Sequence, residues 1–141
     1  MHALATQVWA LALVAISGLA LWRGGRPERI FALINLVAWL ATVLLVNRRD
    51  LGDPQWGMFA VDTLMLAAML WLSLTTQRFW ILPATAFQLL TVVTHLAIMV
   101  DHGVRIRAYL AGLAIWSWLV LGCLGAAVLA RARAGRDPAA T

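Results

Sequence analysis

The sequence predicts an all-α integral membrane protein, a bundle of five transmembrane helices. Of its 141 residues, 63% are hydrophobic and only 12% are charged, whereas roughly a quarter of the residues in soluble domains are charged. The apolar residues form five long runs rather than amphipathic stripes, a pattern typical of lipid contact and not of a water-excluding core. Four spans plus a re-entrant segment is the alternative architecture.

The first run, Ala3–Trp22, is long enough to cross about 30 Å of hydrocarbon. It has no basic residues before its apolar stretch, so it is interpreted as a retained helix and not as a secretory signal. The connector Arg23–Arg29 contains two glycines and a proline, which end one helix and start the next.

The second run, Ile30–Val46, carries three larger or polar residues at helical spacing. Asn35, Trp39 and Thr42 recur at i, i+4 and i+7, so they share one face of the helix. We expect this face to turn towards protein and not towards lipid.

The third and fourth runs, Met58–Leu74 and Trp80–Val100, form the centre of the predicted bundle. The polar connector between them, Thr75–Phe79, is so short that the two helices must form an antiparallel hairpin. Pro83 falls in the first turn of the fourth run, where its missing N–H costs little.

The fifth run, Tyr109–Ala130, contains Gly122, Ala126 and Ala130 at four-residue spacing. Such a ridge of small residues lets two helix backbones approach closely, so these three are predicted at a helix–helix contact. Residues 1–130 then form one transmembrane domain, and residues 131–141 form a basic tail that is predicted to be disordered beyond its first few residues.

The central hairpin holds the only two ionisable residues that lie well inside apolar runs, Asp62 and His95. Counted from the connector, they reach nearly the same depth, and ionisable residues at membrane depth mark candidate functional sites. Gln88 and Thr91 share a helical face with His95. The pair is interpreted as a structural clasp between the two helices, or as a proton or ion relay that continues through Gln88 and Thr91, or as a carboxylate solvated from outside.

No catalytic, metal or cofactor motif is found, so the protein is not expected to be an enzyme. Cys123 is the single cysteine, which excludes an internal disulfide. His95 as a haem or chlorin ligand is a weaker alternative, and the pair Met65 and Met69 is typical of packing rather than of copper binding. The net charge of +5 comes from arginines in connectors, where they set membrane orientation and do not indicate nucleic acid binding.

The arginines predict which end of the bundle faces the cytoplasm. With five spans, the first connector, the third connector and the tail share one side and carry seven arginines, against four on the other side. Since cytoplasmic connectors are the more basic ones, we expect a cytoplasmic C-terminus and an N-terminus outside. Trp22 and Trp80 then lie at the inner interface, and Trp56 and Tyr109 at the outer one.

The segment from Gln77 to Ala97, QRFWILPATAFQLLTVVTHLA, followed by Arg105–Tyr109, resembles small uncharacterised multi-span membrane proteins of alphaproteobacteria. In those proteins, a hairpin entry with tryptophan and proline is followed by a dipeptide that ends in histidine. Here that dipeptide is Thr94–His95. Here Ile81 and Leu82 separate Trp80 from Pro83, which departs from the tighter pattern. The resemblance implies a multi-pass helical bundle in a bacterial inner membrane and implies no activity.

Three classes of function remain. The first is an accessory or structural membrane protein that packs with itself or with other membrane subunits. The second is a small proton or ion pathway that uses Asp62 and His95. The third is a lysis-type pore former, against which the five spans and the buried charged pair argue.

Overall fold

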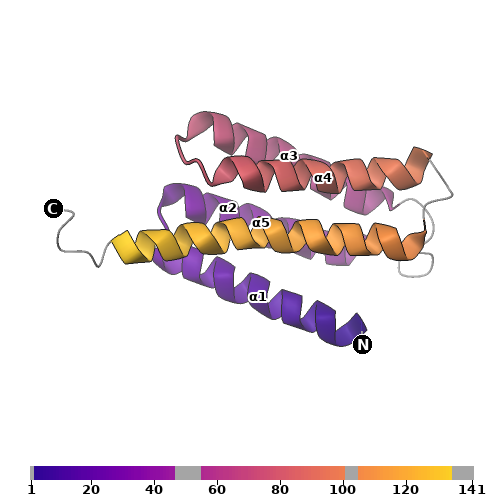
Figure 1. The fold of residues 1–141 in the computed structure, drawn as a ribbon, viewed down its shortest axis with the longest axis horizontal. Helices are drawn as coiled ribbons and strands as arrows, with labels where there is room; N and C mark the ends of the chain where they lie inside the picture. The colour runs from indigo at the N-terminus through magenta and orange to yellow at the C-terminus, as the bar shows by residue number, and fades with distance from the viewer. Residues whose placement is uncertain (1, 47–54, 101–104, 135–141) are drawn as a thin grey trace.

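The computed structural model describes residues 2–46, 55–100 and 105–134, and in these residues it contains five α-helices and no strand (Figure 1). The helices are α1 (His2–Arg23), α2 (Arg26–Leu45), α3 (Trp56–Thr75), α4 (Ile81–Val100) and α5 (Ile106–Ala134). Each of the five is long and apolar enough to cross a membrane. The predicted fold class is therefore confirmed, with five spans in place of the four-span alternative.

Two helices extend beyond their apolar runs. Helix α2 begins at Arg26, because Pro27 suits the first turn of a helix and Glu28 complements the positive end of its dipole. Helix α5 continues past Ala130 to Ala134. Alanine and arginine are strong helix formers, and the basic residues of the last turn complement the negative end of the dipole. The start of the predicted tail is therefore helical, and residues 135–141 lie outside the described residues.

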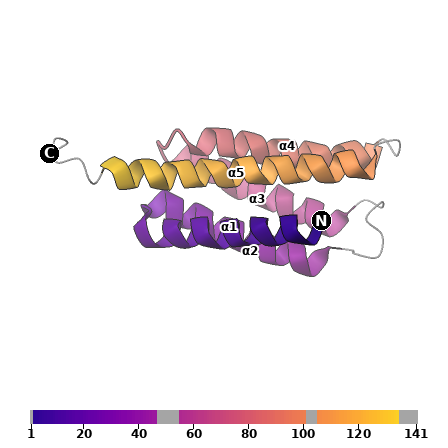
Figure 2. The ribbon, with the colours of Figure 1, turned by 60° about the horizontal axis from the view of Figure 1, so that its bottom comes forward.

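The helices pack as a bundle in which α5 lies between two hairpins. Helix α4 contacts both α3 and α5, α2 contacts both α1 and α3, and α1 closes the arrangement against α5. Figure 2 shows α1 and α2 on one side of α5, and α4 on the other. We call the end where α1 begins the N-terminal end, and the end with the α1–α2 and α3–α4 connectors the connector end.

The apolar core occupies the half of the bundle near the connector end. Its fully buried members come from all five helices and include Ala20, Phe31, Met69, Leu72, Ala84 and Leu124. Met65 and Met69 are both buried in this core, which agrees with their interpretation as packing residues. Lipid tails are as apolar as leucine, so close packing, and not exclusion from water, holds this core together.

We predict that Leu124→Ala destabilises the bundle by about 2–5 kcal/mol, because Leu124 is fully buried and its removal leaves a void. Reversible unfolding in mixed micelles, followed by circular dichroism, measures the change. Leu129→Ala on the same helix is the control, since Leu129 is 51% exposed and its loss opens no cavity. Equal effects of the two substitutions would contradict the assigned core.

Candidate functional site

The third and fourth helices bring Asp62 and His95 into direct contact. His95 Nε2 lies 2.9 Å from Asp62 Oδ2, and the His95 side chain is completely buried while that of Asp62 is 19% exposed. The short connector makes the two helices antiparallel, and equal residue counts from it bring both groups to one depth. The predicted approach of these two residues is confirmed.

Gln88 joins the pair, whereas Thr91 does not. The Gln88 side-chain amide donates to Asp62 Oδ1 at 3.0 Å and to the Asp62 backbone carbonyl at 3.1 Å. The Thr91 hydroxyl instead donates to the Phe87 carbonyl of its own helix at 3.2 Å, as threonines inside helices often do. The relay that was expected to continue from the pair through Thr91 therefore lacks a hydrogen bond between Thr91 and the pair.

Tyr109 at the start of α5 completes the cluster, and sequence reasoning missed it. Its hydroxyl lies 2.8 Å from His95 Nδ1, and the residue is only 2% exposed. A tyrosine at the end of an apolar run is typical of the aromatic belt at the membrane interface. Tyr109 does lie in the first turn of α5, but it faces the protein interior and not the interface. Gln88, Asp62, His95 and Tyr109 form one hydrogen-bonded chain across α3, α4 and α5, which we call the buried network.

The hydrogen bonds of the buried network favour one arrangement of protons. An ionised Asp62 can only accept, so His95 Nε2–H donates to it and the Tyr109 O–H donates to Nδ1. A doubly protonated His95 would force the tyrosine oxygen to accept, and its O–H would then lack an acceptor among the described residues. A neutral imidazole between an ionised Asp62 and the Tyr109 hydroxyl therefore fits these two contacts.

Asp62 and Gln88 also lie on the wall of a cavity of about 830 Å³ in the half of the bundle near the N-terminal end. All five helices contribute to its lining. Asn35, Trp39 and Thr42 are on this wall, so the expectation that their shared face turns towards protein is confirmed. The buried network thus has one side in packed protein, at His95 and Tyr109, and one side on a cavity.

The predicted ridge on α5 does not pack within the chain. Gly122, Ala126 and Ala130 are all exposed, and a Cβ added to Gly122 would meet nothing within 4 Å. The packed face of α5 is the neighbouring one, which includes the buried Leu121 and Leu124. The prediction that this ridge lies at a helix–helix contact is therefore wrong within the single chain. The reason is that a bulkier apolar face of α5 packs against the core.

At the connector end, a buried glutamate ties α2 to the start of α4. Glu28 is 2% exposed, and its Oε1 accepts from the Trp80 indole N–H at 3.2 Å. Its Oε2 has no hydrogen-bond partner among the described residues. A Cβ on Gly25 would lie 2.8 Å from that oxygen and 3.0 Å from Arg131 Nη1, so the glycine leaves room for both groups.

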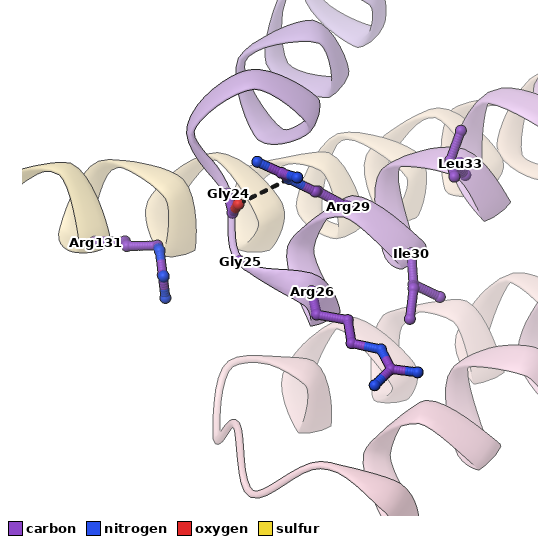
Figure 3. A pocket seen from close by; sticks show the side chains of 7 residues that line it. All are labelled: Gly24, Gly25, Arg26, Arg29, Ile30, Leu33 and Arg131. Atoms are coloured by element: carbon purple, nitrogen blue, oxygen red, sulfur yellow. Dashed lines mark hydrogen bonds between the residues drawn. The ribbon is translucent and has the colours of Figure 1, made fainter.

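Three arginines surround this connector. Arg26, Arg29 and Arg131 line a hollow of about 610 Å³, and Arg29 Nε donates to the Gly24 carbonyl at 3.0 Å (Figure 3). The hollow is open at the end of the bundle, next to the buried carboxylate of Glu28. Three arginines therefore line the hollow at the connector end, whereas the Asp62 carboxylate lies in the N-terminal half.

Comparison with protein-family models finds no match, and comparisons with curated proteins and with solved structures find no significant one. Within the described residues, no group of three or more His, Cys, Asp or Glu side chains could hold a metal ion. The site is therefore defined by its geometry alone.

We predict that Tyr109→Phe destabilises the bundle by about 1–3 kcal/mol, because His95 Nδ1 loses its buried donor. Equilibrium unfolding in micelles measures the loss. Ser117→Ala on the same helix is the matched control, since the Ser117 hydroxyl only donates to the Ala114 carbonyl of its own helix. A loss no greater than that of the control would show that the tyrosine bond adds nothing.

Proposed function

We propose that the protein is a non-enzymatic accessory or structural protein of a bacterial inner membrane, which packs with itself or with other membrane subunits. The location of the described residues supports this role. Nearly all described residues belong to five membrane-crossing helices, so a partner must contact helix surface within the bilayer or the short connectors at its edges.

The observation that carries this proposal is the unoccupied small-residue face of α5. The ridge of Gly122, Ala126 and Ala130 is exposed, while the core of the chain packs on other residues of the same helix. In a bilayer, helices associate through close van der Waals contact, and ridges of small residues permit the closest approach. A helix of a second chain fits such a face better than lipid tails do.

The buried network has the role of a clasp in this proposal. An aspartate at membrane depth without a partner costs about 2.5–3.5 kcal/mol even on insertion scales. The hydrogen bonds from His95 and Gln88 offset this cost only when α3 and α4 meet in one rotation. Tyr109 then fixes α5 against the same histidine.

The proposed orientation places the connector end in the cytoplasm. Arg26, Arg29 and Arg131 gather there, and the anionic cytoplasmic leaflet attracts basic residues close to the membrane. The seven-to-four bias of the arginines supports the same placement.

A proton or ion pathway is the second candidate, favoured by the contact of Asp62 with the cavity. The opposite half of the bundle argues against conduction across the whole membrane. There, Met69, Leu72 and Leu124 are at most 1% exposed, so apolar side chains fill the interior between the network and the connector end. A short relay confined to the N-terminal half is the form of this candidate that the geometry favours.

We predict that Gly122→Leu disrupts association of the protein with its partner without lowering the stability of the single chain. Light scattering after mild extraction, or co-purification in native nanodiscs, measures the association. Gly18→Leu is the matched control, because a Cβ at Gly18 on α1 also meets nothing within 4 Å but lies off the ridge. Association that survives Gly122→Leu would remove the ridge from the proposal.

We predict that reporter fusions after Arg136 and within residues 47–54 report opposite sides of the membrane, with the first in the cytoplasm. Three helices separate the two points, so the chain crosses the bilayer an odd number of times between them. Activity assays of paired phosphatase and fluorescent-protein fusions give the answer. If both fusions reported the same side of the membrane, the predicted topology would be wrong.

We predict that liposomes containing the protein lose a pH gradient no faster than empty liposomes, because the apolar core closes one half of the bundle. A pH-sensitive dye trapped in the lumen follows the gradient. Faster loss with the wild-type protein, abolished by Asp62→Asn, would instead support the second candidate.

A further inference from the structure

The cavity beside the buried network has the size of a ligand-binding site. Its volume of about 830 Å³ lies within the range of small-molecule sites, roughly 300–1,000 Å³. Three of its lining residues are tryptophans, Trp9, Trp39 and Trp118. The rings of Trp9 and Trp39 are 6.3 Å apart and tilted by 45°, so they form one aromatic corner.

The wall of this cavity carries an acidic side chain and no basic one among the described residues. Among the described residues that line it, Asp62 is the only ionisable one, and none is basic. The histidine that bonds Asp62 is fully buried and is not on the lining, so the carboxylate and not the imidazole borders the cavity. The wall therefore offers a cation one carboxylate, with no competing basic side chain among the described lining residues.

The Trp9 indole gives an independent sign that the cavity takes a ligand. Trp9 lies on the cavity wall, and its Nε1–H is buried with no hydrogen-bond partner among the described residues. A buried donor without a partner costs about 1–3 kcal/mol, and a ligand with an acceptor group would remove that cost.

We propose that this cavity binds an amphiphilic organic monocation, with its positive centre between the Asp62 carboxylate and the indole rings. Indole faces attract cations within about 6 Å, most strongly where water is excluded. The remaining wall, which includes Leu110 and Leu113, accommodates apolar arms of the ligand. This binding activity goes beyond the accessory role and does not depend on it.

An inorganic ion fits the cavity less well than an organic cation. Hard cations such as Ca²⁺ and Mg²⁺ require six or more oxygen ligands in a shell. Most of this wall is aliphatic or aromatic, and Asp62 is its only carboxylate among the described residues. An organic cation uses the carbon surfaces that an inorganic ion would leave unmatched.

Binding of tritiated tetraphenylphosphonium to the purified full-length protein in micelles tests the proposal, with empty micelles as the blank. We expect saturable binding that unlabelled tetraphenylphosphonium displaces. Triphenylphosphine oxide, a neutral molecule of similar shape, should displace the label at least tenfold less well. Absence of saturable binding, or equal displacement by the neutral compound, would overturn the proposal.

Two substitutions locate the bound cation. Asp62→Asn should weaken binding at least tenfold, but it also alters the buried network. Ala114→Trp avoids that complication, because Ala114 lies on the cavity wall and is not one of the four residues of the network. Ala111→Trp is its control, since Ala111 is exposed on the same helix and lies off the lining.

We expect Ala114→Trp to abolish binding and Ala111→Trp to retain it, with both variants folded by circular dichroism. Wild-type affinity in Ala114→Trp would show that the cation binds elsewhere and would overturn the proposal. The association measured with Gly122→Leu is a separate readout, so failure of the accessory role and failure of this site are distinguishable.

Discussion

The bundle depends on one constraint, which is that a carboxylate inside a bilayer must find hydrogen-bond donors within the protein. Hydrocarbon cannot supply them, and an unsatisfied polar group in it costs several kcal/mol. Asp62 obtains its donors from Gln88 and His95, seven residues apart on one face of α4. Both bonds form in only one rotation of α3 against α4, so the aspartate fixes how these two helices pack. The hydrogen bond of Tyr109 to His95 fixes α5 in the same way.

The two halves of the molecule differ in how they are held together. Near the connector end, side chains such as Phe31, Met69 and Leu124 fill the interior, and dispersion between them stabilises the helices. Near the N-terminal end, the interior holds the buried network and a cavity of about 830 Å³. Unfilled space forgoes packing energy, so a bundle selected for stability alone would fill it. The polar network and the cavity therefore share the half of the bundle that is less favourable for packing.

The sequence allowed the spans and the central pair to be predicted, because both follow from counting along one chain. Apolar runs of sufficient length identify helices, and equal distances from a short connector place Asp62 beside His95. Tyr109 was missed, since its position at the end of a run does not tell how α5 is rotated about its axis. The same uncertainty of rotation left the partner of Gly122 undetermined, because small residues at four-residue spacing do not distinguish contacts within a chain from contacts between chains. Glu28 was overlooked among the arginines of its connector, where burial depends on tertiary contact with Trp80.

The protonation of His95 in a lipid nanodisc tests the central claim most directly. Solid-state NMR of protein with ¹⁵N-labelled histidine distinguishes the protonated from the unprotonated ring nitrogens, and a His95→Gln sample identifies the signals of His95. From the buried network we expect a neutral ring that carries its proton on Nε2. Its Nδ1 should accept a hydrogen bond from the Tyr109 hydroxyl. A doubly protonated ring, or a neutral ring with its proton on Nδ1, would contradict the network.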